Sequence, residues 1–269
     1  MGLNIDGTRF LLHAHKLGVD FSHTCMIGRQ GLHLTVAELE SNLKDFGFDA
    51  SSANSLFTLP ETCYYKIGQA NISFAEPLLR FLGAKETVSF DASPAEKATY
   101  IHDFNYPLSE EFFDRFSVVL DSGTLEHIFN FPVAIASCMQ MVKLGGHFLS
   151  ITPANGLCGH GLYQFCPDLF YRIFNTDNGF TLCGMLSSDE TGKNWKPVPD
   201  PNIVNHRVQI DGYAYLLIIA QKIATVPLFS RSVRQSDYTV GWLLHERLDE
   251  RNPAALRWVS ECLGSRRSV

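Results

Sequence analysis

Acidic and small residues follow an apolar run near the middle of the chain, at a position suited to binding a polar ligand. The run covers residues 116–120, and Asp121, Ser122 and Gly123 come directly after it. A Gly145-Gly146 turn then leads into a second apolar run over 147–152. We predict two neighbouring parallel strands joined by a helix, and ligands of open α/β sheets bind at the carboxyl ends of such strands.

Two more acids end predicted strands upstream. Asp91, followed by Ala92, ends a strand over 86–91, and Asp103, followed by Phe104, ends a strand over 99–103. Carboxylates at this edge can accept hydrogen bonds from ligand hydroxyls and amines. Each acid also has an alternative role that is purely structural. Asp91 suits a helix N-cap, Asp103 suits a turn before Pro107, and Asp121 suits a buried cap of the next helix.

A glycine-rich loop over 155–165 carries the residues that we expect to face an acceptor molecule. Glycines at 156, 159 and 161 permit sharp bends that would present Asn155, His160, Tyr163 and Gln164 to one cavity. His160 suits a general base, since its unperturbed pKa lies near neutrality. Tyr163 suits orientation of an amine or hydroxyl, or contact with a cation through its ring. The alternative is an ordered loop whose polar groups bond only one another.

Strands that alternate with helices predict an α/β fold: a Rossmann-like, doubly wound, mostly parallel seven-stranded sheet with helices on both faces. Runs over 206–210 and 213–221, joined by Asp211-Gly212, predict a C-terminal antiparallel hairpin. Thr35 and Glu38 form a capping-box pattern for a helix over 36–46. We treat residues 1–269 as one domain, with a lid insertion at about 32–73 and a C-terminal extension over 225–269.

In these motifs the chain resembles class I S-adenosylmethionine-dependent methyltransferases of a bacterial branch. The likeness covers most of 8–222 and is most specific over 88–174; its motifs are at 89–93, 102–105, 121–127, 152–155 and 159–165. It implies S-adenosylmethionine as cofactor, with Asp91 and Ala92 at the ribose and Asp103 and Phe104 at the adenine. It also implies that Asp121, Ser122, Gly123 and His127 lie near the methionine portion, although Glu126 and His127 suit a purely structural helix start as well.

The chain departs from the family in lacking its G-x-G-x-G loop after the first strand. We take Gly28-Arg29-Gln30-Gly31 as the equivalent, with Gly28, Arg29 and Gln30 binding the cofactor. The Arg29 guanidinium would then hold the methionine carboxylate by charge-assisted hydrogen bonds. The rival equivalent is Gly68-Gln69-Ala70.

The resemblance implies methyl transfer to a small-molecule acceptor, in specialised metabolism, by in-line displacement at the sulfonium methyl. One alternative is an intramolecular cyclase that converts S-adenosylmethionine into azetidine-2-carboxylate and methylthioadenosine. Another is a binding module without catalysis. The acceptor and the oligomeric state stay open.

Composition and residue spacing limit the partners, the cellular compartment and the metal sites that we expect for this protein. A net charge of -6 and a pI of about 5.9 argue against a nucleic-acid partner. Seven scattered cysteines without a C-x-x-C pair favour reduced thiols in a cytoplasmic protein, and no apolar stretch predicts a membrane span. We expect no metal, because His13 and His15 lie two apart on a predicted helix and do not share a face.

Overall fold

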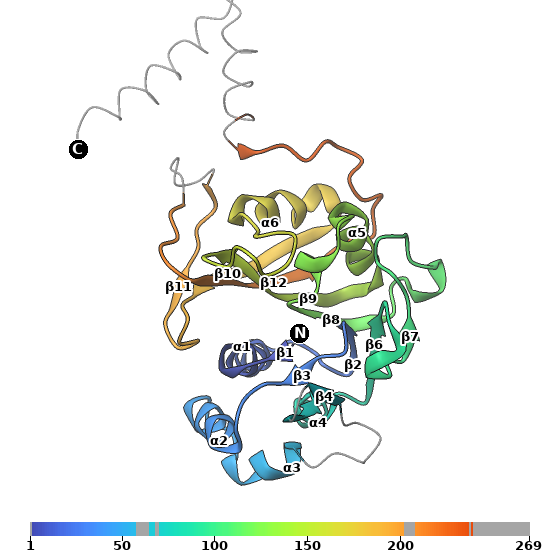
Figure 1. Ribbon diagram of the computed structural model, residues 1–269. Coiled ribbons are helices and arrows are strands. Elements are labelled where there is room, and N and C mark those ends of the chain that lie inside the picture. The colour runs from blue at the N-terminus through green and yellow to red at the C-terminus, as the bar shows by residue number, and fades with distance from the viewer. Residues whose placement is uncertain (1, 58–64, 68–69, 202–207, 237, 239–269) are drawn as a thin grey trace, which may run out of the picture.

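The computed structural model describes residues 2–57, 65–67, 70–201, 208–236 and 238 (Figure 1). Its α-helices are α1 (Ile5–Lys16), α2 (Val36–Asp45), α3 (Ala53–Phe57), α4 (Glu76–Phe81), α5 (Phe131–Met141) and α6 (Pro167–Ile173). Its 3-10 turns are η1 (Ala50–Ser52), η3 (Pro94–Glu96), η4 (Glu110–Phe112), η5 (Leu125–His127) and η6 (Thr176–Asn178). Its strands are β1 (Gly2–Leu3), β2 (His23–Ile27), β3 (Gly31–Leu32), β4 (Tyr65–Ile67), β5 (Ala70–Phe74), β6 (Glu86–Asp91), β7 (Tyr100–Ile101), β8 (Phe116–Ser122), β9 (Val142–Asn155), β10 (Phe180–Ser188), β11 (Trp195–Pro197) and β12 (Ala214–Lys222). Over the described residues, every helix is too short or too polar to traverse a bilayer.

Eight strands form the central sheet, in the order β11-β10-β12-β9-β8-β2-β6-β7. The strands from β9 to β7 pair in parallel, whereas β12 lies antiparallel between β9 and β10, and β11 pairs antiparallel with β10. From β2 the chain passes outward to β6 and β7, then returns to the other side of β2 through β8 and β9. The strand order therefore reverses between β2 and β8, where doubly wound sheets open a crevice.

The predicted fold class is confirmed, but two of its details are wrong. The sheet has eight strands instead of seven, because β11 adds an edge strand. With only three residues, β11 is too short to show the alternation of polar and apolar residues that predicts a strand. The partner of β12 in the antiparallel region is β10, not a strand over 206–210: residues 208–210 form no strand, and 206–207 lie outside the described residues. Because β12 is buried on both faces, it suits an inner position better than an edge hairpin.

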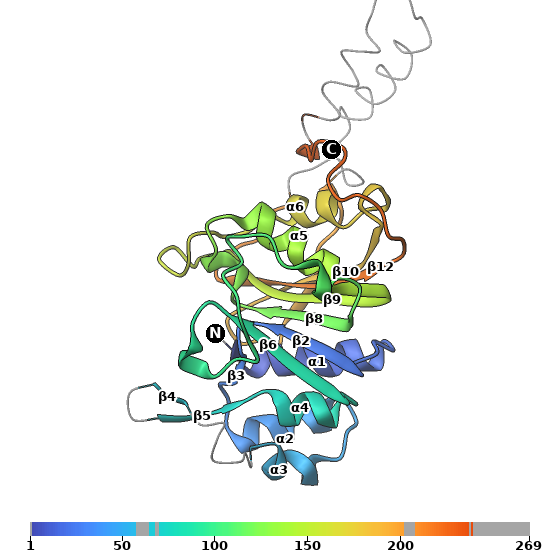
Figure 2. The ribbon, with the colours of Figure 1, turned by 90° about the vertical axis from the view of Figure 1, so that its right-hand side faces the viewer.

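Helices cover both faces of the sheet. The two views agree that α5 and α6 lie on one face and α1 on the other, with α2, α3 and α4 beyond α1 (Figures 1 and 2). Alternate residues of one strand enter opposite cores: Val119 packs in the core that contains α5, and Val118 and Leu120 pack in the core that contains α1. This alternation follows from the two-residue period of a strand.

The predicted lid segment contains ordered structure packed below the sheet. The capping box at Thr35 is present, since Glu38 donates its backbone N–H to the threonine hydroxyl and accepts from the threonine N–H. Leu39 and Leu43 of α2 are fully buried in the core below α1. A second sheet, in the order β1-β3-β5-β4, lies beside this layer. A lid function stays a prediction, as does the C-terminal extension, whose residues 239–269 lie outside the described part.

Candidate functional site

A pocket of about 400 Å³ opens at the carboxyl ends of β2, β6 and β8. Its lining residues come from four separate chain segments, and they are Gly28, Phe90, Asp91, Ala92, His102, Asp103, Phe104, Asn105, Thr124, His127 and Ile128. Six residues predicted to bind the cofactor are in this lining: Gly28, Asp91, Ala92, Asp103, Phe104 and His127. The fold therefore brings together positions as far apart in sequence as 28 and 127.

The two carboxylates at the pocket are held by tight local turns. Asp91 Oδ1 accepts a 2.9 Å hydrogen bond from the Ser93 N–H, and Asp103 Oδ1 accepts from both the N–H and the side-chain amide of Asn105, at 2.9 and 2.8 Å. These are Asx turns, so the local alternative for Asp103 holds in the structure. No described residue donates to Oδ2 of either acid. Each carboxylate can therefore form its turn and still accept from a ligand.

Between the carboxylates the pocket wall is aromatic. Phe104 is only 4% exposed and packs edge-on against the ring of Phe90, with centroids 6.0 Å apart. The ring of His102 meets Phe104 at 5.0 Å and 87°. Ile128 adds an aliphatic surface. An apolar wall between two acceptors suits a flat ring that carries hydroxyl and amine donors at its ends.

Arg29 and Gln30, which we expected at the cofactor, lie outside the pocket lining. The Arg29 guanidinium pairs with Glu76 at 2.7 Å, donates to the Glu96 carbonyl at 2.8 Å, and lies 4.0 Å from the centroid of the Phe74 ring. Gln30 is fully buried and donates to the Ile27 carbonyl. Arg29 thus joins the loop after β2 to α4 and η3, since a charge buried this deeply needs a partner. The rival loop at 68–69 lies outside the described residues.

Asp121 adopts the capping role that the sequence left as its alternative. It is fully buried and accepts from the N–H groups of Thr124 and Leu125 at 3.0 and 3.2 Å, and from the Ser150 hydroxyl at 2.7 Å. Burial raises the pKa of Asp121 above its ordinary value. Ser122 donates to the Gly2 carbonyl, and Gly123 turns the chain with φ +79°. These predicted cofactor residues shape the turn that presents Thr124 and His127 to the pocket.

The loop over 155–165 bends at its glycines but does not gather its polar side chains in one cavity. The Asn155 amide donates to the carbonyls of Ile210 and Gly212, which fixes the approach to β12. The Tyr163 hydroxyl donates to the Phe129 carbonyl at 2.7 Å. Of the three predicted catalytic residues, His160 is the one whose side chain faces an acidic group, the carboxyl of Glu126.

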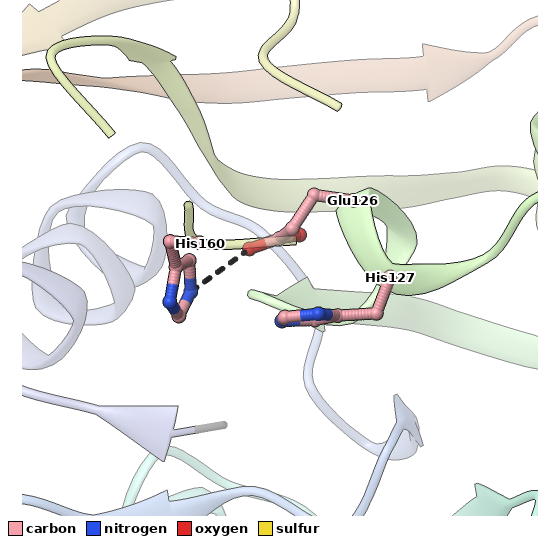
Figure 3. Close-up of side chains that lie close together, drawn as sticks. All are labelled: Glu126, His127 and His160. Atoms are coloured by element: carbon pink, nitrogen blue, oxygen red, sulfur yellow. Dashed lines mark ion pairs between the residues drawn. The ribbon is translucent and has the colours of Figure 1, made fainter. Parts of the chain in front are cut away.

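Sequence reasoning missed Glu126 as a member of the site. Figure 3 shows its carboxylate and the His160 ring pointing toward one another, with His127 beside them. The Glu126 side chain is fully buried, and its Oε1 lies 3.8 Å from Nε2 of His160, which is half exposed. Burial and the charge of Asp121 raise the pKa of Glu126. The motif contained the residue, but no local signal showed that a loop 34 positions later would meet it.

Two further cavities lie on the β12 side of the same sheet edge. One of about 130 Å³ is lined by groups from α1, β12, the loop after β3 and the segment after β10, including Asp6, His33 and Tyr215. A larger one of about 650 Å³ lies between β11 and residues 209–214 and is mostly polar. Neither reaches the ends of β6 and β7, where Asp91 and the turn of Asp103 lie, so the 400 Å³ pocket is our candidate cofactor site.

The burial of Asp6 at the smaller cavity can be tested through the pH dependence of the free energy of unfolding. The carboxyl is 2% exposed and accepts from Trp195 Nε1 at 2.8 Å; burial raises its pKa from 3.8 to about 6. The folded state therefore binds this proton more tightly than the unfolded state, so its contribution to stability is complete below pH 4 and is lost as the pH rises through about 6. Asp6→Asn removes the titration and keeps an acceptor for Trp195.

Urea unfolding between pH 4 and 7 should show Asp6→Asn gaining up to about 3 kcal/mol relative to the parent as the pH rises. Asp49→Asn is the matched control, because hydrogen bonds from Ser51 lower the pKa of exposed Asp49 and reverse the sign of its effect. A difference between Asp6→Asn and the parent that stays constant with pH would contradict the assignment.

The central sheet is a doubly wound, mostly parallel Rossmann-like sheet in which β12 is inserted antiparallel between β9 and β10. No family model matches the chain, and no curated protein matches it. Solved structures similar to it include TehB from Haemophilus influenzae, at 9% identity and TM-score 0.40 over 79% of this chain and 61% of that chain. The branched-chain polyamine synthase from Thermus thermophilus, in complex with N4-aminopropylspermidine and 5'-methylthioadenosine, shows 12% identity and TM-score 0.41 over 85% and 59%.

A third similar structure is the 1,6-didemethyltoxoflavin-N1-methyltransferase of Burkholderia thailandensis with bound 1,6-didemethyltoxoflavin and S-adenosylhomocysteine. It shows 15% identity and TM-score 0.42 over 82% of this chain and 78% of that chain. The present chain spans about 60% of the length of the first two structures. These likenesses concern the fold and not the reaction.

Proposed function

We propose that this protein transfers the methyl group of S-adenosylmethionine to a small-molecule acceptor. The observation that carries the proposal is the 400 Å³ pocket at the reversal of strand order, where Asp91 and Asp103 flank an apolar wall that includes Phe104. An adenosine offers the matching groups: two ribose hydroxyls, an aromatic base and an exocyclic amine.

Five of the lining residues have a part in the proposed binding of the cofactor. Asp91 accepts from both ribose hydroxyls, and Asp103 accepts from the adenine amine while Phe104 packs against the ring. Gly28, with φ +72°, lets the ligand approach the backbone at the end of β2. His127 lies at the side of the pocket that borders Glu126 and His160, so we place the sulfonium there.

The methyl carbon of a sulfonium is already activated, so the protein mainly aligns donor and acceptor and excludes water. The acceptor lone pair forms the new bond to carbon while the carbon–sulfur electrons stay on sulfur. His160 and Glu126 are the ionisable groups beside that end of the pocket, and we assign His160 the removal of an acceptor proton where one must leave. The net charge of -6 favours a small acceptor over a nucleic acid.

One incubation tests the proposal against both alternatives. Purified protein is given S-adenosylmethionine, first alone and then with a fractionated metabolite extract, and the products are separated by mass. S-adenosylhomocysteine that forms only with the extract supports methyl transfer. Methylthioadenosine formed without an acceptor would contradict methyl transfer and support the cyclase alternative. Absence of any heat stabilisation by S-adenosylmethionine or S-adenosylhomocysteine would favour a binding module and overturn the proposal.

A further inference from the structure

Glu126, His127 and His160 converge at one point beside the candidate cofactor pocket. Glu126 and His127 come from η5 at the end of β8, and His160 comes from the loop after β9. One ligand atom from each lies within 4.8 Å of the other two, and the two imidazole centroids are 5.1 Å apart (Figure 3). All three side chains thus border one small volume.

The Glu126 carboxylate lacks the partners that a buried acid needs. Its side chain is 0% exposed, and among the described residues neither Oε1 nor Oε2 receives a hydrogen bond. The His160 ring, at 3.8 Å, is beyond hydrogen-bond distance. Buried polar groups in native proteins are nearly always satisfied, so an orphaned carboxyl group close to two imidazoles is a candidate ligand for a bound cation.

The backbone holds His160 at this position. The N–H groups of Leu162 and Tyr163 both donate to the Glu126 carbonyl, at 2.7 and 3.1 Å. Between them and His160, Gly161 adopts φ +80°, and a Cβ there would lie 2.9 Å from Glu126 Cγ. Only glycine permits this approach. The contact between the loop and η5 is therefore built into the fold instead of being a chance meeting of surface side chains.

We propose that Glu126, His127 and His160 bind one divalent transition-metal ion. Two imidazoles and one carboxylate suit Zn²⁺ or Fe²⁺ better than Mg²⁺ or Ca²⁺, which take mostly oxygen ligands. Ligand atoms around a tetrahedral zinc lie roughly 3.3 Å apart, so the exposed histidines would turn inward by about 1–1.5 Å from their present spacing. This proposal departs from the expectation of no metal, which considered only histidines near one another in sequence.

Three protein ligands leave a coordination position open, as in catalytic zinc sites. His127 also lines the 400 Å³ pocket, so that position adjoins the proposed cofactor site. We assign the open coordination position to an oxygen of the acceptor, and this assignment rests on the function proposed above. It makes a hydroxyl- or carboxylate-bearing molecule the preferred substrate class. The metal site itself does not depend on that function, but a metal ion there would replace the proton-removing role given to His160 above. An imidazole nitrogen that binds a metal has no lone pair left to take a proton, and the ion would instead lower the pKa of the bound acceptor hydroxyl.

Metal binding to the full chain tests the proposal directly. The protein is stripped with EDTA, exchanged into chelator-free buffer and titrated with Zn²⁺ by calorimetry, and with Co²⁺ to follow its visible absorption. We expect one equivalent to bind, with affinity reduced by at least about 100-fold in His160→Ala and in Glu126→Gln. His23→Ala removes an exposed histidine at the opposite end of β2 and should bind as the parent does.

Two results would overturn the proposal: no stoichiometric binding by the parent, or equal affinity in the parent, His160→Ala and Glu126→Gln. His160 lies on the surface, so its alanine variant should fold even if Glu126→Gln does not. The affinity of the stripped protein for S-adenosylmethionine is measured in parallel. If the nucleoside binds and the metal does not, only this inference fails; if the nucleoside does not bind, the proposed function fails on its own.

Discussion

Asp91→Ala is expected to raise the Kd for S-adenosylmethionine by roughly 10- to 150-fold. The change removes a charged acceptor for two ribose hydroxyls, which is worth about 1.5–3 kcal/mol. Calorimetry or equilibrium dialysis with S-adenosylmethionine or S-adenosylhomocysteine measures the effect. The free energy of unfolding should change by much less, because Asp91 is half-buried and its side chain accepts one hydrogen bond, from the Ser93 N–H.

Asp49→Ala is the matched control for this prediction. Asp49 accepts from the Ser51 N–H at 2.9 Å in the same type of turn, but it lies before η1, away from the pocket. Its replacement should leave the cofactor Kd unchanged. If Asp91→Ala bound the nucleoside as tightly as the parent, the ribose assignment would be wrong.

Asp121→Ala is expected to lower the free energy of unfolding by about 3–5 kcal/mol. The change leaves the Thr124 and Leu125 N–H groups and the Ser150 hydroxyl without their acceptor in a fully buried place. It also releases the turn that presents His127, so cofactor affinity should fall as a secondary effect. Urea unfolding monitored by circular dichroism gives the stability directly.

Asp121→Asn separates the hydrogen bonds from the charge. The amide oxygen can still accept from both N–H groups, and the amide nitrogen can donate to the Ser150 hydroxyl. We therefore expect the asparagine variant to stay within about 1 kcal/mol of the parent. Equal destabilisation by alanine and asparagine would contradict this prediction and would show that the negative charge itself is required for stability.

The pocket could be predicted from sequence to the extent that it is built from strand ends. Asp91 and Asp103 each follow a short apolar strand, and parallel strands place their carboxyl ends at one edge whatever the rest of the fold does. The same logic does not give the direction of the Arg29 side chain, which follows β2 and pairs with Glu76. A backbone position can be inferred from a pattern, whereas the direction of a long charged side chain depends on which partner packs nearby.

The order of apolar runs, turns and strand-end acids determined the doubly wound sheet and its helices on both faces. It also determined that Gly28, Asp91, Asp103 and His127 would meet at one pocket. These features depend on local periodicity and on the geometry of parallel strands, both of which are written along the chain. Only the tertiary structure decided that β10 would be the partner of β12, that Asp121 would be a cap, and that His160 would meet Glu126. Those outcomes depend on close approaches between distant segments, such as that of Gly161 to η5, and no spacing within the sequence encodes them.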